Sequence, residues 1–118
     1  MLSFFLNIQS QFKVLHWQTQ SYARHIAFGE TYTILDGLID NFVETYIGKY
    51  GKLAFEQDSI IQISNIGEIE LDDFLETIIS YLLSLNDSVN ELRDSDLLNI
   101  RDEMLAQINK LKYLLTLQ

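Results

Sequence analysis

The chain of 118 residues contains no cysteine and no proline. Without cysteine it can form neither disulfide bonds nor thiolate metal sites. Without proline, no segment carries the residue that most strongly interrupts a helix. The absence of proline favours long helices. The absence of cysteine leaves histidine and carboxylate side chains as the potential ligands of any metal site.

Basic residues and long apolar runs are also scarce. Eight Lys and Arg against seventeen Asp and Glu give a net charge of −9, which repels nucleic-acid phosphates and attracts cations. We therefore expect no DNA binding. No apolar run approaches the ~20 residues of a membrane-spanning helix, so we expect no membrane association. The first residues lack the basic start and the cleavage site of a secretory signal, which predicts a cytoplasmic protein.

Apolar residues make up 47% of the chain, enough for the core of a single domain over residues 1–118. They recur at intervals of three and four residues, the period of an amphipathic helix. The pattern predicts helices over residues 1–18, 26–46, 71–92 and 97–115.

The ends of the predicted helices carry recognisable signals. Gly48 and Gly51 are expected to end the second helix, and Asp94 or Ser95 is expected to cap the fourth. Residues 52–69 break the helical pattern and are predicted to form a crossover. The predicted fold class is therefore all-α, a four-helix bundle of two helical hairpins joined by a crossover, as in ferritin-like proteins.

The only two histidines, His16 and His25, are candidate metal ligands together with Asp40 and Glu44. Asp40 and Glu44 lie one helical turn apart and can share an ion. His25 precedes Asp40 by fifteen residues. At ~1.5 Å per residue this is roughly 22 Å along one helix, which no single ion spans. Two copies of the helix, antiparallel about a two-fold axis, would bring His25 of one copy to the carboxylates of the other.

The pattern also excludes an iron site of the ordinary ferritin type within one chain. Such a site uses Glu-x-x-His motifs on several helices of one bundle. This chain has no Glu-x-x-His motif, and its third and fourth predicted helices contain no histidine. A metal site in this protein is therefore expected to lie between subunits.

Residues 16–44 contain His16-Trp17, then His25-x-x-Phe28-x-x-x-Tyr32-x-x-Leu35, then Ile39-Asp40-x-x-x-Glu44. This pattern resembles the Dps family of mini-ferritins. In that family a His-Trp pair closes the first helix, a second histidine opens the second, and an Asp-x-x-x-Glu follows fifteen residues later. Both the fifteen-residue and the four-residue spacings match.

The resemblance implies a ferroxidase that oxidises Fe(II) with hydrogen peroxide or dioxygen and sequesters Fe(III). His16 and His25 would be the metal ligands of one subunit, and Asp40 and Glu44 those of its partner. Trp17 would lie beside the iron. Zinc and manganese are competing metals. The implied assembly is a two-fold dimer that builds a dodecameric cage, in the cytoplasm of a bacterium or a phage-infected host.

The chain departs from the family at several points. The two histidines are nine residues apart rather than about a dozen. Gly29 stands where some members carry a carboxylate, and Glu30 points about 100° away on the helix. The basic N-terminal arm by which some members bind DNA is missing. Compact chains of this kind resemble proteins carried by bacteriophages.

Other interpretations stay open for the same residues. The histidines can be structural, Asp36, Asp40 and Glu44 can form an ordinary solvated helix face, and Trp17 can be a packing residue. The protein would then be a ferritin-like structural or interaction module, such as a phage accessory protein, with a vestigial metal site. A further alternative is an acidic helical dimer that binds a protein partner through its aromatic residues. A native mass near twelve subunits would favour the mini-ferritin.

Overall fold

The computed structural model describes residues 1–117, in which every regular element is a helix and no strand occurs. The four α-helices are α1 (Leu2–Gln18), α2 (Tyr22–Tyr50), α3 (Leu71–Ser84) and α4 (Ser95–Leu114). Short 3-10 helices occupy η1 (Ile66–Glu68) and η2 (Leu85–Asp87). The predicted all-α class is confirmed. Among these described helices, none is long and apolar enough to cross a membrane.

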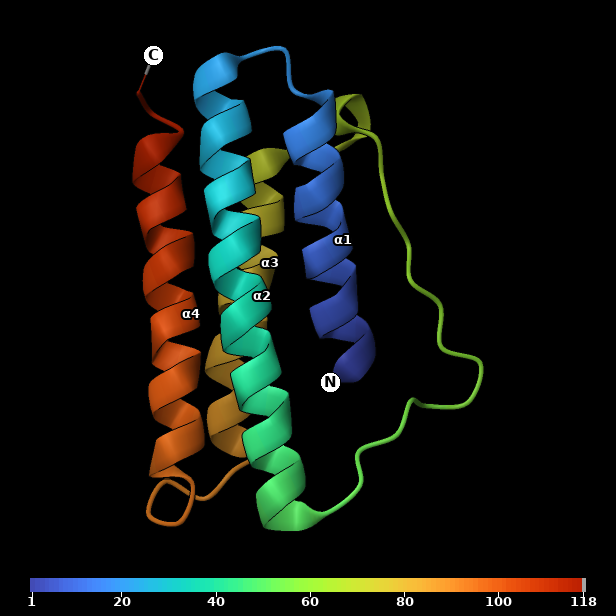
Figure 1. Cartoon of the computed structure of the whole chain (residues 1–118), viewed down its shortest axis with the longest axis vertical. Helices are drawn as coiled ribbons and strands as arrows, with labels where there is room; N and C mark the ends of the chain where they lie inside the picture. The colour runs from blue at the N-terminus through green and yellow to red at the C-terminus, as the bar shows by residue number, and fades with distance from the viewer. Residues whose placement is uncertain (118) are drawn as a thin grey trace.

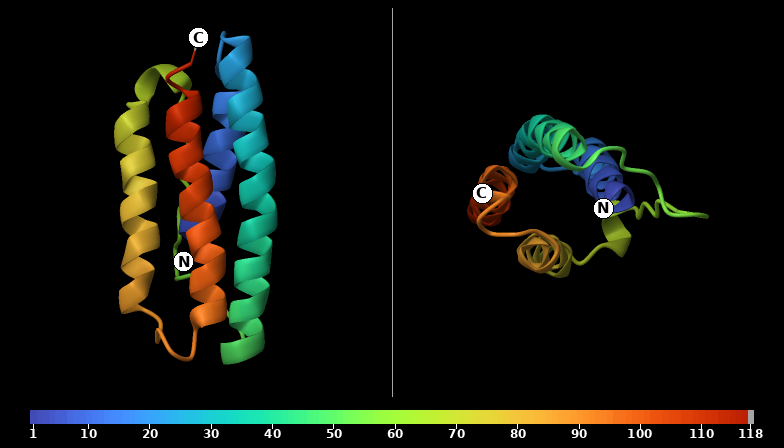
Figure 2. Two further views of the ribbon diagram at one scale, coloured as in Figure 1. Left: turned by 90° about the vertical axis from the view of Figure 1, so that its left-hand side faces the viewer. Right: turned by 90° about the horizontal axis from the view of Figure 1, so that it is seen from below.

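The helices form an elongated bundle in which α2 and α3 run in the same direction (Figure 1). α1 and α2 are antiparallel neighbours, and α3 and α4 form a second antiparallel pair. Between α2 and η1 the chain passes outside α1 and returns to the end of the bundle where α2 began. Seen end on, α1, α2, α4 and α3 follow one another around the bundle (Figure 2).

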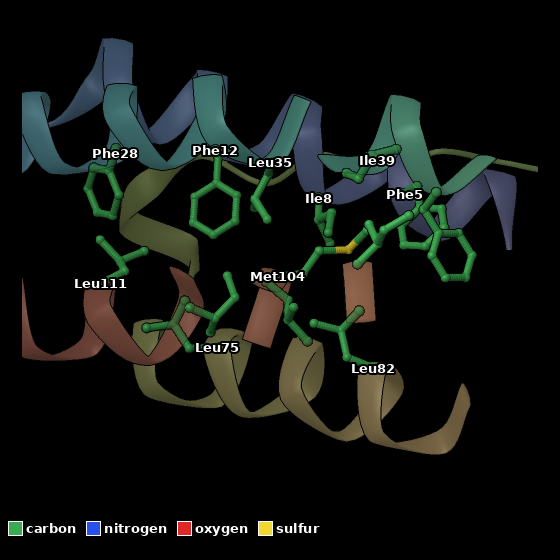
Figure 3. Packing of buried hydrophobic residues seen from close by; sticks show 14 of the residues in the cluster. Phe5, Ile8, Phe12, Phe28, Leu35, Ile39, Leu75, Leu82, Met104 and Leu111 are labelled. Carbon is green, nitrogen blue, oxygen red and sulfur yellow. The ribbon is translucent and has the colours of Figure 1, made fainter. Parts of the chain in front are cut away.

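The core lies along the axis of the bundle, and all four helices contribute to it. Most of the apolar residues at helical spacing in the sequence become buried, and the close view of the core shows several of them (Figure 3). Labelled there are Phe5, Ile8, Phe12, Phe28, Leu35, Ile39, Leu75, Leu82, Met104 and Leu111. Full burial of such a side chain stabilises the fold by about 1.5–3 kcal/mol relative to exposure, so the bundle is held mainly by these contacts.

Local signals set both ends of α2. At its start, the hydroxyl of Ser21 accepts a hydrogen bond from the Arg24 amide at 3.2 Å, a side-chain N-cap. At its end, Gly51 has a φ of 86°, a left-handed conformation that favours glycine. Its amide donates to the Ile47 carbonyl at 2.7 Å. Gly48 lies within the helix, so Gly51 alone of the two predicted glycines ends it.

The third helix is shorter than its apolar pattern predicts, ending at Ser84 instead of Leu92. Beyond η2, the Asn90 side chain accepts hydrogen bonds from the amides of Leu92 and Arg93. Such a side chain competes with the helical backbone for donors, so residues 90–93 form a turn and do not continue the helix. Leu92 is 94% exposed and contributes nothing to the core.

The connection that follows α2 is held to α1 by amide side chains. Gln11, which is buried, donates to the Ser64 carbonyl and accepts from the Ser64 amide, both at 2.9 Å. Asn7 donates to the Gln62 carbonyl at 2.7 Å. These bonds satisfy backbone groups that have no partner in a sheet or helix. The crossover is therefore extended but anchored along α1.

Candidate functional site

The fold brings the two histidines together. His16 lies in the last turn of α1 and His25 in the first turn of α2, so the short turn between the helices places them side by side. Their imidazole rings stack with centroids 3.9 Å apart and planes inclined by 16°. Nδ1 of His16 lies 2.7 Å from the His25 carbonyl oxygen, and Nδ1 of His25 lies 2.7 Å from the His16 carbonyl oxygen.

These two hydrogen bonds fix where the imidazole protons lie. A carbonyl oxygen only accepts, so Nδ1 of each ring must carry the hydrogen. In the neutral ring, Nε2 then keeps its lone pair. A histidine that ligates a metal commonly donates its other ring nitrogen to a carbonyl in this way. Each imidazole is therefore held in a tautomer that can bind a metal ion through Nε2.

The stacking also limits how the pair can bind metal. An ion bound to imidazole lies close to the ring plane. Planes inclined by 16° with centroids 3.9 Å apart meet on the order of 14 Å from the rings, whereas a metal–nitrogen bond is ~2.1 Å long. One ion cannot lie in both planes at bonding distance. In this arrangement His16 and His25 can serve two different ions but cannot chelate one.

Because Gly29 has no side chain, the His16 ring can lie against α2. A Cβ atom at position 29 would lie 2.7 Å from both Cε1 and Nδ1 of His16. Gly29 is one helical turn beyond His25, so the ring of His16 occupies the space that a side chain there would need. This contact gives the physical reason for glycine at the position where the resemblance leads one to expect a carboxylate. The sequence did not reveal this role of Gly29, because it does not show which side chain packs against residue 29.

Asp40 and Glu44 lie on the exposed surface of α2, away from the histidines of the same chain. α2 is unbroken over Tyr22–Tyr50, so the spacing of roughly 22 Å between His25 and Asp40 holds. Within residues 1–117, no group of three or more His, Asp or Glu side chains is close enough to hold a metal ion. One subunit brings the two histidines together and does not bring the carboxylates to them.

The candidate ligands on α2 nevertheless share one sector of the helix. At about 100° per residue, Asp40 lies about 60° and Glu44 about 100° around the helix from His25. Asp36 lies nearer α1, where it accepts a hydrogen bond from Gln9 at 3.0 Å. Asp40 and Glu44 are thus free to face a partner, whereas Asp36 is engaged within its own hairpin.

Trp17 follows His16 but is 67% exposed, so it is not a core residue of one chain. The ammonium of Lys13 lies 5.7 Å from the centre of the Trp17 ring and 4.6 Å from that of Tyr32. Together with residues of α1 they line an open groove of about 360 Å³ between α1 and α2. Lys13 places a positive charge in this groove. The sequence pattern alone did not single out Lys13.

A separate polar cluster joins the end of α2 to the start of α4. Asp94, buried at the start of α4, accepts hydrogen bonds from the Tyr50 hydroxyl at 2.5 Å and from the Asn90 amide at 2.8 Å. Lys49 lies 3.4 Å from the same carboxylate. The bond from Tyr50, with that from Asn90 and the charge of Lys49, lowers the pKa of Asp94. The cluster fastens the end of α2 to the start of α4.

The chain is thus an all-helical protein whose candidate metal ligands are divided between a histidine pair and an exposed carboxylate pair. It belongs to the family of unknown function DUF5856, whose model matches residues 16–115 and so includes all four candidates. It is similar to the uncharacterized 14.6 kDa protein in the mobD-ri intergenic region of Enterobacteria phage T4, with 39% identity over 51 residues. That match covers 43% of this chain and 40% of the phage protein, less than half of either. No solved structure matches the chain.

Proposed function

We propose that this protein binds and oxidises Fe(II) at a site shared between two subunits, and that it sequesters the product in a Dps-like assembly with a ferritin-like bundle. The observation that carries the proposal is the histidine pair. Both Nδ1 atoms are occupied by backbone carbonyls, which leaves both Nε2 atoms as metal ligands. A histidine that ligates a metal commonly adopts this tautomer.

The donor set fits iron. Two imidazole nitrogens and two carboxylates suit Fe(II), with zinc and manganese as competitors. His16 and His25 would come from one subunit, and Asp40 and Glu44 from its partner. Because the two stacked rings cannot share an ion, we propose that the site holds two iron ions, each bound by one imidazole. Iron is here the substrate, and no resident cofactor is required.

The chemistry balances without a nucleophile or a general base from the protein. Two Fe(II) ions each lose one electron, and one hydrogen peroxide accepts both electrons with two protons to give two waters. Dioxygen is the other candidate oxidant. The negative charges of Asp40 and Glu44 stabilise Fe(III) more than Fe(II), which favours the loss of the electron. The net charge of −9 would draw Fe(II) towards the protein.

The shared site requires a two-fold dimer in which α2 packs antiparallel against α2 of the partner and crosses it near Thr33. Thr33 is exposed and lies midway between His25 and Asp40. The same face of α2 carries Ile26, which is 47% exposed, and Ile47, which is 40% exposed. These apolar side chains are only partly covered within one chain. Further association of such dimers into a dodecameric cage is part of the proposal.

Subunit mixing tests the proposal. Asp40→Ala/Glu44→Ala and His16→Ala/His25→Ala should each abolish Fe(II) oxidation while circular dichroism shows unchanged helix content. After subunit exchange, a mixed dimer holds one site with all four ligands and one with none, so part of the activity should return. The measurement is the absorbance of Fe(III) with limiting peroxide, before and after exchange.

The controls separate the alternatives. Glu91→Ala/Glu103→Ala, which removes two exposed carboxylates outside α2, should leave oxidation unchanged. A site within one chain predicts no recovery on mixing. Wild-type protein that oxidises iron no faster than buffer would refute the enzymatic proposal.

The reciprocal bonds of His16 and His25 also favour a second candidate, a ferritin-like structural or interaction module with a vestigial site. In that case the histidines serve only to fasten α1 to α2. The similarity to a phage protein accords with a phage accessory role. A stable dimer that neither binds Zn²⁺ nor oxidises Fe(II) would support this candidate, whereas a particle of about twelve subunits that retains iron would support the first.

A further inference from the structure

We infer that Gly29 is a positioning residue for the histidine pair, and that its missing side chain lets the His16 imidazole lie on α2 and stack on His25. Glycine inside a helix is less favourable than alanine, so a glycine there calls for a local reason. At Gly37 and Gly48, also within α2, an added Cβ would meet no atom within 4 Å. At Gly29 it would meet two ring atoms of His16 at 2.7 Å.

The ring has little freedom to move away. One of the two atoms that the new Cβ would strike is Nδ1, the atom that donates to the His25 carbonyl at 2.7 Å. A shift of about 1 Å would lengthen that hydrogen bond beyond the ~3.2 Å limit of a normal N–H···O bond. It would also disturb the stack, because His25 lies against the same ring at 3.9 Å. Gly29 therefore controls the orientation and the tautomer of His16 together.

The effect on metal binding rests on the proposed function. If Nε2 of His16 ligates iron, a side chain at position 29 that displaces the hydrogen bond from Nδ1 to the His25 carbonyl should weaken metal affinity about 10- to 100-fold. The same contact determines the composition of the site. A carboxylate cannot stand at position 29 while His16 is stacked, so Asp40 and Glu44 of the partner remain the carboxylate ligands.

The first test needs no metal. Long-range ¹H–¹⁵N NMR of the imidazoles should show a hydrogen on Nδ1 of both His16 and His25 in the wild-type protein. Gly29→Ala should lose this signature for His16, whereas the matched control Gly48→Ala should retain it. A Gly29→Ala protein with unchanged ring signals overturns the inference.

The second test is a double-mutant cycle of thermal stability. Gly29→Ala should lower Tm in the wild-type background and raise it in the His16→Ala background, where the ring has been removed. If Gly29→Ala alone does not fold, the His16→Ala/Gly29→Ala protein should fold and so support the contact. An equal effect of Gly29→Ala in both backgrounds, or failure of both proteins to fold, overturns it.

The third test relates the contact to the site. Titration with Co²⁺, followed by its visible absorption, should give a Kd about 10- to 100-fold weaker for Gly29→Ala than for Gly48→Ala. Equal affinities of the two variants overturn the positioning role in metal binding. If even wild-type protein binds neither Co²⁺ nor Zn²⁺, the proposed function fails, while the NMR and stability results still decide whether Gly29 positions His16.

Discussion

His16 and His25 each donate a hydrogen bond from Nδ1 to the backbone carbonyl of the other, at 2.7 Å in both directions. The two bonds join the last turn of α1 to the first turn of α2, where helical carbonyl and amide groups begin to lack partners. The same bonds leave both Nε2 atoms available. One arrangement thus fastens the helical hairpin and prepares two imidazoles for metal binding.

The first prediction concerns the coupling of the two histidines. His16→Ala and His25→Ala should each destabilise the protein by about 1–3 kcal/mol, because each removes one ring of the stack and one hydrogen bond between the two helices. The double variant should cost less than the sum of the two, since either single change already breaks the stack. Urea denaturation measures the three values. Strict additivity would mean that the rings act independently.

The second prediction concerns the dimer. Because the chain has no cysteine, Thr33→Cys introduces a single thiol near the proposed two-fold axis. The same residue of the partner should then lie opposite, and mild oxidation should give a disulfide-linked dimer. Non-reducing electrophoresis detects it. Thr77→Cys, on the exposed surface of α3, is the control and should remain uncrosslinked under the same conditions. A Thr33→Cys protein that stays monomeric would exclude the proposed crossing.

The third prediction concerns the pH dependence of stability. The hydrogen bond from Tyr50 lowers the pKa of Asp94, so the carboxylate stabilises the folded protein above its ordinary pKa of about 4. This stabilisation is lost as the pH falls through the lowered pKa of the folded state. Asp94→Asn should therefore reduce Tm at pH 7 and differ little from wild type in strong acid.

Thermal unfolding monitored by circular dichroism from pH 7 downwards measures this difference. Asp87→Asn, at an exposed site in the same connection, is the control. A Tm difference for Asp94→Asn that does not shrink as the pH falls would show that the charge of Asp94 is not the cause.

The fourth prediction concerns the crossover. Gln11→Ala removes both hydrogen bonds to Ser64 and should cost about 1–3 kcal/mol of stability, because two half-buried backbone groups lose their partner. Hydrogen exchange should accelerate over residues 52–65 more than in α2 or α4. Ser10→Ala, at an exposed neighbouring position, should leave exchange unchanged. Equal exchange in the two variants would show that Gln11 does not anchor this segment.

The fifth prediction concerns nucleic acid. At micromolar concentration and ordinary ionic strength, the protein should not shift duplex DNA in a gel, because its net charge of −9 opposes the phosphates. Lys49, Lys52, Lys110 and Lys112 are too few to form a basic stripe. A clear shift that disappears as salt is raised would contradict this prediction.

The sequence by itself determined the helical class and most helix positions. Apolar residues at intervals of three and four, without proline, leave few alternatives to amphipathic helices, and Gly51 supplies a local end signal. It also determined that His25 and Asp40 cannot share an ion within one chain, because the rise of a helix is constant. The end of α3 was not predictable from periodicity, since Leu92 fits the apolar pattern but lies in a turn set by Asn90.

Only the tertiary structure decided how the candidate residues are arranged around α1 and α2. The stack of His16 on His25, its two carbonyl bonds and the space above Gly29 depend on the angle at which two helices meet. Gln11 of α1, which anchors the crossover, is a similar case, because its partner Ser64 lies 53 residues away. Periodicity reports which face of one helix is apolar, whereas contacts between helices depend on side chains distant in sequence, and these are fixed only when the whole core packs.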